Sequence, residues 1–81
     1  MAKILFFGRF SDLSEPLEID LPDFVTDKKS LSDFLSDQIE GFAVLAAKSD
    51  TRISVNMMVS MKEVPVRNSD EIAYMSALSG G

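Results

Sequence analysis

The sequence predicts a small domain of the α+β class, in which one helix packs on one face of a mixed β-sheet. Three observations predict this class. The 81 residues suffice for one hydrophobic core, one segment has helical periodicity, and segments of strand length lie on both sides of it. The order strand, strand, helix, two short strands, strand favours a sheet of about five strands with one main helix across it.

Two strands are predicted before the helix. The segment from Ala2 to Phe7 is mostly apolar, is rich in residues that favour strands, and is followed by Gly8. In the segment 17–21, three apolar residues alternate with Glu18 and Asp20, which is the period of a half-buried strand. Pro22 then ends this strand. The turn segment 11–16 makes the two strands a hairpin.

The main helix is predicted over residues 31–40. Four apolar residues at helical spacing form one stripe: Leu31, Phe34, Leu35 and Ile39. Ser30 is suitable as the N-cap, and Asp33 has the position of a reciprocal capping residue. Gly41 is suitable as the C-terminal stop of this helix.

The rest of the chain is predicted to hold a helical turn and three strands, at residues 42–48, 53–56, 58–60 and 71–75. Asn56-Met57 would form a turn, and Pro65 marks a loop. We therefore divide the chain into a folded domain over residues 1–75 and a flexible tail over residues 76–81, which ends in Gly-Gly.

The composition excludes several kinds of function. Cysteine and histidine are absent, which excludes disulfides, zinc sites of these ligands, thiol nucleophiles and imidazole bases. We expect no metal site. The formal charge of -5 repels nucleic acid and anionic lipid, so neither nucleic acid nor a membrane is an expected partner. No apolar run approaches the roughly 20 residues that cross a bilayer, and we expect a cytoplasmic protein.

The last four residues, Leu78-Ser79-Gly80-Gly81, are the most informative segment. Because glycine has no side chain, Gly80 and Gly81 could pass through a narrow channel and deliver a terminal carboxylate into another protein. Such a carboxylate must first be activated, for instance as an acyl-adenylate. The sequence has no phosphate-binding loop of the G-x-x-x-x-G-K-[ST] type, so a separate activating enzyme would be required. From the two glycines alone, the alternative remains that they are simply the frayed end of the chain and have no function.

Segments along the whole chain carry a resemblance to a known family: Lys3-Ile4-Leu5-Phe6-Phe7-Gly8, Val55-Asn56, the Pro65 loop that leads to Asp70-Glu71-Ile72-Ala73-Tyr74-Met75, and Ser79-Gly80-Gly81. They resemble the MoaD family, the small sulfur-carrier subunits of molybdopterin synthase. The resemblance implies that the domain over residues 1–75 has a ubiquitin-like β-grasp fold.

The resemblance also implies a role in molybdenum cofactor biosynthesis. An activating enzyme of the MoeB type would use ATP to adenylate Gly81, and a sulfur donor would convert the adenylate to a thiocarboxylate. Leu78, Ser79 and Gly80 would enter the large MoaE-type subunit with Gly81, and the sulfur would pass to cyclic pyranopterin monophosphate. Two small subunits would cap a dimer of large ones. The chain would bind no cofactor and would act only as the sulfur-donor subunit of this enzyme.

The family resemblance further implies that Phe7, Val59 and Met75 contact the large subunit. The alternative is that they fill the core, which is the commoner location of apolar strand residues. The family commonly has Pro-Pro-Val where this chain has Ser76-Ala77-Leu78, so ordering the tail should cost more free energy here.

Other functions remain open. The chain could carry sulfur for thiazole formation or tRNA thiolation, or could modify lysines as ubiquitin does. A third class is a ubiquitin-like interaction module in which the terminal glycines have no role. Among the polar residues, Arg9, Lys28 and Lys29 are expected to be ordinary surface charges. The neighbours Asp70 and Glu71 should point to opposite faces of a strand and so cannot act as a catalytic pair.

Overall fold

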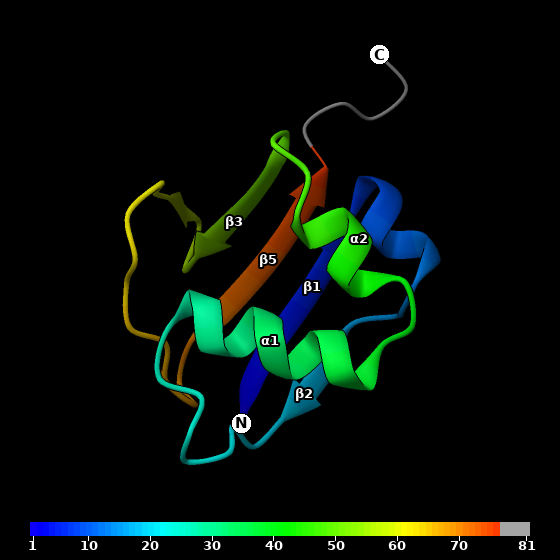
Figure 1. Ribbon diagram of the computed structural model, residues 1–81. Coiled ribbons are helices and arrows are strands. Elements are labelled where there is room, and N and C mark those ends of the chain that lie inside the picture. The colour runs from blue at the N-terminus through cyan, green and yellow to red at the C-terminus, as the bar shows by residue number, and fades with distance from the viewer. Residues whose placement is uncertain (77–81) are drawn as a thin grey trace.

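Figure 1 shows the computed structural model, which describes residues 1–76. A twisted β-sheet carries two helices on one of its faces. The elements follow one another as β1 (Ala2–Phe7), the 3₁₀ helix η1 (Gly8–Asp12), β2 (Leu17–Ile19), α1 (Lys28–Gln38), α2 (Phe42–Ala46), β3 (Thr51–Val55), β4 (Met58–Val59) and β5 (Glu71–Ser76). None of the helices in this described part has the length and apolar character that a bilayer crossing requires.

The sheet is mixed and has five strands in the order β2-β1-β5-β3-β4. Strands β1 and β5 are parallel, and the other neighbouring pairs are antiparallel. A parallel pair needs a long crossover connection, and the chain between β1 and β5 supplies it with α1 on the way. The predicted α+β class is confirmed, and the arrangement is that of a β-grasp-like fold.

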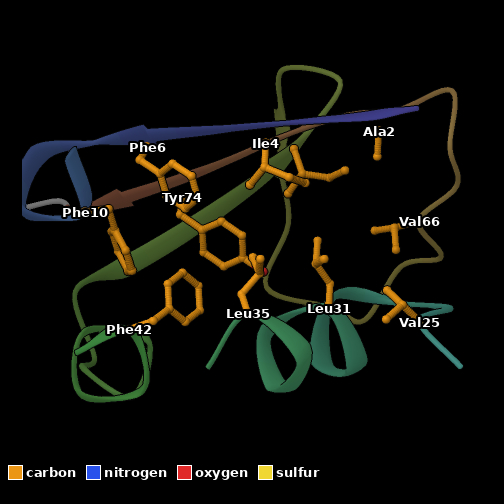
Figure 2. Packing of buried hydrophobic residues seen from close by; sticks show 11 residues of the cluster. Ala2, Ile4, Phe6, Phe10, Val25, Leu31, Leu35, Phe42, Val66 and Tyr74 are labelled. Atoms are coloured by element: carbon orange, nitrogen blue, oxygen red, sulfur yellow. The ribbon is translucent and has the colours of Figure 1, made fainter. Parts of the chain in front are cut away.

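The core lies between the sheet and the two helices. The register pairs Ile4 with Ile72 and Phe6 with Tyr74, so these four side chains share the face that the helices cover. Figure 2 shows Phe6 and Tyr74 pointing from the sheet towards Phe42 of α2. The buried hydrophobic residues form one cluster: Ala2, Ile4, Phe6, Phe10, Val25, Leu31, Leu35, Phe42, Val66, Ile72 and Tyr74.

Helix α1 begins at Lys28, three residues before the predicted start, because Asp27 and not Ser30 is its N-cap. The Asp27 Oδ1 atom accepts a hydrogen bond from the Ser30 amide at 2.8 Å. In return, the Ser30 hydroxyl accepts from the Asp27 amide at 3.0 Å, which completes a capping box. The prediction of Ser30 as N-cap was therefore wrong, although Ser30 belongs to the cap as its third helical residue.

The predicted stop at Gly41 was also wrong, because α1 ends earlier, at Gln38. Gly41 lies between the two helices with a φ of 86°, a left-handed conformation that favours glycine, and precedes α2. Helix α2 ends at Ala46, within the predicted turn over 42–48. Its first residue, Phe42, is fully buried and contacts Tyr74 edge-on, with ring centroids 4.9 Å apart.

The strands differ from prediction only at their ends. Strand β2 is shorter than expected, and the Leu21 amide instead donates to the Asn68 side chain at 2.9 Å. Strand β3 begins at Thr51, which pairs with Ser76 at the end of β5. The boundary predicted between domain and tail thus falls one residue before the end of β5.

Candidate functional site

The face of the sheet opposite the helices, which we call the open face, carries no helix in the described part of the chain (Figure 1). Strands alternate their side chains between two faces, so residues next to the core positions Ile4, Phe6 and Tyr74 point to the open face. On β1 these are Lys3, Leu5 and Phe7, and on β5 they are Glu71, Ala73 and Met75. The open face is therefore apolar along β1 and β5 except at the end where Lys3 pairs with Glu71.

The pairing of the strands brings the three predicted interface residues together. Phe7 of β1 lies directly beside Met75 of β5. Val59 of β4 pairs with Ser54 of β3, and Ser54 pairs in turn with Ala73 of β5. A shallow hollow of about 310 Å³ lies among these strands and is lined by Leu5, Phe7, Ser54, Met57, Val59, Glu71, Ala73 and Met75. We call it the open-face hollow.

The exposed fractions of Phe7, Val59 and Met75 show whether these side chains fill the core or lie on the surface. Phe7 is 49% exposed and Val59 is 54% exposed, whereas Met75 is half-buried. The alternative that Phe7 and Val59 fill the core is therefore excluded. Large apolar side chains that share an exposed hollow are typical of a binding surface. Contact of Phe7, Val59 and Met75 with a large subunit stays a prediction.

The turn between β3 and β4 forms one rim of the hollow. Its two central residues, Asn56 and Met57, have φ angles of 52° and 71°, as a tight hairpin turn requires. Asparagine tolerates this left-handed conformation, whereas methionine is strained in it. Met57 is 87% exposed. This strained turn therefore holds an apolar side chain in solvent at the rim of the open-face hollow.

Asn56 holds this turn against the start of β5. Its Nδ2 atom donates to Asp70 Oδ1 at 2.9 Å, and its Oδ1 atom accepts from the Glu71 amide at 2.9 Å. The other Asp70 oxygen accepts from the Arg67 amide at 2.8 Å. Both oxygens of the Asp70 carboxylate therefore accept hydrogen bonds that hold the loop and the turn in place. Asp70 precedes β5, so only Glu71 of the two predicted strand neighbours lies on the strand, and that they form no catalytic pair stays a prediction.

Sequence reasoning missed Met57 as part of this surface. The sequence predicted a turn at Asn56-Met57, but the predicted interface residues Phe7, Val59 and Met75 all lie in strands. The signal was present in the sequence, because an apolar residue in a two-residue hairpin turn has no core within reach. Met58 and Met61 are also exposed beside the hairpin.

Gly8 fixes the path of the chain at the upper end of this site. It has a φ of 62°, and a Cβ atom added there would lie 3.0 Å from Ser76 Cβ and 3.2 Å from the Ser76 carbonyl oxygen. Any side chain at position 8 would displace the last residue of β5. Gly8 therefore constrains the position of Ser76, the last residue that the structure describes.

Lys28 is not the ordinary surface charge that the sequence predicts. It is only 7% exposed, and its Nζ atom donates to the Ser60 carbonyl oxygen at 2.6 Å. This bond ties the first turn of α1 to the chain just after β4. Lys29 fits the prediction, because it is exposed and pairs with Asp33 at 3.2 Å, and Arg9 is exposed as well.

Two ionisable groups have displaced pKa values in residues 1–76, and both have structural causes. Burial raises the pKa of the Tyr74 hydroxyl, which is hydrogen-bonded to the Ser32 hydroxyl at 2.9 Å. The hydrogen bonds from the Ser30 amide and hydroxyl lower the pKa of the Asp27 carboxyl group. No group of three or more metal-ligating side chains is assembled in the described residues.

The predicted tail residues Leu78, Ser79, Gly80 and Gly81 lie outside the described residues. The chain matches no protein-family model and no curated protein.

Proposed function

We propose that this protein is a sulfur carrier that acts as the small subunit of a molybdopterin synthase, with Gly81 as the residue that holds the sulfur. One observation carries the proposal. The resemblance to the MoaD family assigns Phe7, Val59 and Met75 to the large-subunit interface, and these residues lie far apart in the sequence. They line one hollow on the open face, as a shared contact surface requires.

The position of the hollow supports the delivery of a carboxylate to a partner. Met75 lines the hollow, and Ser76, the next residue, is the last one of β5. Five further residues can span at most about 17 Å. A partner that covers the hollow would therefore need its active site within about this distance of Ser76.

The pairing of Ser76 reduces the effect of the missing prolines. The family commonly has two prolines where this chain has Ser76 and Ala77, and proline lowers the conformational entropy that is lost on ordering. Because Ser76 pairs with Thr51 in the sheet, the fold already orders the first of these two positions. The extra cost of ordering then concerns the residues after Ser76.

The proposed cycle begins with activation of the carboxylate. The Gly81 carboxylate oxygen attacks the α-phosphorus of ATP in a MoeB-type enzyme, pyrophosphate leaves, and an acyl-adenylate forms. A donor at the oxidation level of sulfide displaces AMP and leaves a thiocarboxylate. In the large subunit the thiocarboxylate sulfur bonds to a side-chain carbon of cyclic pyranopterin monophosphate as an oxygen group leaves that carbon. Water then cleaves the acyl–sulfur bond, which leaves the sulfur on the pterin and restores the Gly81 carboxylate.

The composition of the chain fits this division of labour. A thiocarboxylate is a sulfur nucleophile that needs no cysteine, and the sequence has none. The phosphate of the pterin substrate needs cationic ligands, and a chain of formal charge -5 is poorly suited to supply them. The large subunit would provide the acid, the base and the phosphate-binding groups.

Intact mass spectrometry tests the proposal. The full chain is coexpressed with a MoeB-type enzyme and a sulfur donor, and a chain without Gly81 serves as the control. We expect the full chain to gain the mass difference between sulfur and oxygen, and the shortened chain to stay unmodified. As a positive control, the activating enzyme must modify its own carrier in a parallel experiment. If it does so and the mass of the full chain stays unchanged, the proposal is contradicted. The proposal requires a free carboxyl group on Gly81 in the working protein.

The open-face hollow favours one second candidate, a ubiquitin-like interaction module that needs no terminal carboxylate. Residues appended after Gly81 separate the two functions, because they convert the terminal carboxylate to an amide. The sulfur carrier would lose all activity, whereas the interaction module would keep its partner. A carrier for thiazole formation or tRNA thiolation would be modified at Gly81 but would not copurify with a large synthase subunit.

A further inference from the structure

A second apolar surface lies on the helix side of the protein, away from the open face. It is a groove of about 550 Å³ between the edge strand β2 and helix α1. Its lining comes from two segments of the chain and consists of Leu13, Ser14, Leu17, Ile19, Phe34, Leu35, Gln38, Ile39 and Glu40. Figure 1 shows β2 at the edge of the sheet beside α1, while α2 lies over another part of the sheet.

The groove lies at the edge of the hydrophobic core, where apolar side chains are only partly covered. Leu17, Ile19 and Phe34 are only partly buried and pack against the core cluster from outside. Phe24, which is 68% exposed, extends this apolar surface, since its ring contacts Phe34 edge-on with centroids 6.0 Å apart. Exposed aromatic and aliphatic side chains beside an apolar groove are a common feature of protein-binding sites.

The charge of the chain is divided unevenly around this groove. The segments 12–23 and 33–40, which supply every lining residue, hold eight of the thirteen acidic residues and none of the eight basic residues. Lys29 is the basic residue that pairs with one of them, Asp33. The remainder of the chain carries five acidic and all eight basic residues, which is a formal charge of about +3. The negative charge is thus concentrated in the two segments that form the groove, and of the lining residues Glu40 is acidic.

Strand addition is an unsuitable way to fill this groove. Strand β2 has three residues, lies between Pro16 and Pro22, and carries the charged Glu18 at its centre. Short length, proline and charge are the features by which proteins prevent pairing at a sheet edge. An occupant would instead insert side chains between β2 and the face of α1 that carries Phe34 and Ile39, as an amphipathic helix does in an apolar groove.

We propose that the groove between β2 and α1 binds a basic amphipathic helix of a partner protein. Apolar residues of that helix would contact Leu17, Ile19 and Phe34, and its lysines or arginines would lie near Glu40 and in the negative field of the two acidic segments. The proposal does not depend on sulfur transfer, because it uses neither Gly81 nor the open-face hollow. A partner at this groove could bind while another protein covers the open face.

A peptide selection tests both the site and the charge. The full chain is used to select from a displayed library of peptides of about 18 residues, or about five helical turns. Apolar positions of the library follow helical spacing, and each polar position is randomised among Lys, Arg, Glu and Asp. We expect the selected peptides to carry an excess of Lys and Arg, and to bind at least tenfold more weakly when salt rises from about 0.05 to 0.5 M.

Two charge-reversed variants locate the binding site of the selected peptides. Glu40→Lys places a positive charge at the groove, whereas Glu71→Lys makes the same change at the open-face hollow. We expect about a tenfold loss of affinity for Glu40→Lys and little change for Glu71→Lys, with both variants folded by circular dichroism. Phe24→Ser should weaken peptide binding several-fold, because it removes an apolar side chain from the surface beside the groove. Phe24 is exposed, so the fold should not change.

Four outcomes would overturn the proposal. They are a selection that enriches no peptide, selected peptides that are neutral or acidic, affinity lost in Glu71→Lys but kept in Glu40→Lys, and binding to an uncharged apolar peptide with equal strength. The last outcome would show that the groove takes apolar ligands without regard to charge.

Discussion

The buried ammonium group of Lys28 donates a hydrogen bond to the main-chain oxygen of Ser60, at 2.6 Å. Residues 28 and 60 belong to the start of α1 and to the chain after β4. We expect Lys28→Met to keep the packing of the aliphatic stem but to leave the Ser60 oxygen unpaired, at a cost of about 1–3 kcal/mol in the free energy of unfolding. Urea denaturation measures this change. Lys29→Met, which removes an exposed charge on the same helical turn, should leave stability almost unchanged.

Met57 allows the stability of the hairpin turn to be separated from its binding role. Because Met57 has a φ of 71°, Met57→Gly should relieve strain and stabilise the protein by about 0.5–1 kcal/mol. The same change removes an apolar side chain from the rim of the open-face hollow and should weaken binding of the proposed large subunit. Thermal unfolding and titration calorimetry measure the two effects. A lower free energy of unfolding for Met57→Gly would contradict the inference that the Met57 backbone is strained.

The contact between Gly8 and Ser76 can be tested by a double mutant. Gly8→Ala should destabilise the protein by about 1–3 kcal/mol, because it adds a left-handed alanine and a clash at 3.0 Å with Ser76 Cβ. Ser76→Gly removes that Cβ atom, so the double variant should recover part of the loss. Equal effects of Gly8→Ala in both backgrounds, measured by urea denaturation, would show that only backbone strain matters.

The cap of α1 should make stability depend on pH. Hydrogen bonds from Ser30 lower the pKa of Asp27 in the folded state below its ordinary value of 3.8. This stabilisation is fully present above the unfolded pKa and is lost as the pH falls through the lower folded pKa. Asp27→Asn keeps an N-cap side chain without the charge, so it should be less stable than the wild type at pH 7. The difference should narrow in denaturation curves measured below about pH 3.

The open-face hollow should govern binding of the proposed large subunit. We expect Phe7→Asp and Val59→Asp to weaken this binding by a factor of about ten or more, because each would bury a charge in an apolar contact. Both side chains are about half exposed, so the fold should survive. Phe24→Asp places the same charge on an exposed aromatic residue of the other side and should leave this affinity unchanged. Equal affinities in all three variants would contradict the assigned interface.

The sequence predicted the class of the fold because the main helix and the segment 17–21 have clear periodicities and the other strand segments are short runs rich in residues that favour strands. It could not decide which face of β1 meets the helices, since Ile4 and Phe6 are as apolar as Leu5 and Phe7. The register between β1 and β5 decides it, because it pairs Phe6 with the buried Tyr74. The apolar run therefore predicts both a core face and an open face without assigning residues to either.

The errors at α1 arose where distant contacts determine local structure. Ser30 and Asp27 are both good N-caps by residue type. The chain at Asp27 forms a bridge with Pro65, and the Val66 amide donates to the Thr26 oxygen at 3.0 Å. These contacts hold the chain extended up to Asp27, so the helix begins after it. The burial of Lys28 likewise depends on Ser60, which is 32 positions away.

The candidate site was predictable in part. The resemblance to a family named Phe7, Val59 and Met75, and the strand registers placed them around one hollow. The groove between β2 and α1 was not predicted, because its lining residues follow the ordinary alternation of a half-buried strand and helix. Only the packing of the edge strand against α1 leaves Leu17, Ile19 and Phe34 partly exposed.

The parallel pairing of β1 with β5 has a consequence for how the protein is made. Residues 2–7 have their central partner at residues 71–76, so the sheet has long-range contacts that cannot form early during translation. A nascent chain that has not yet emerged through Ser76 lacks the middle strand of the sheet and its contribution to the open-face hollow. Only chains that have emerged at least through Ser76 can then present the hollow to a partner, and shorter ones expose apolar surface that favours aggregation.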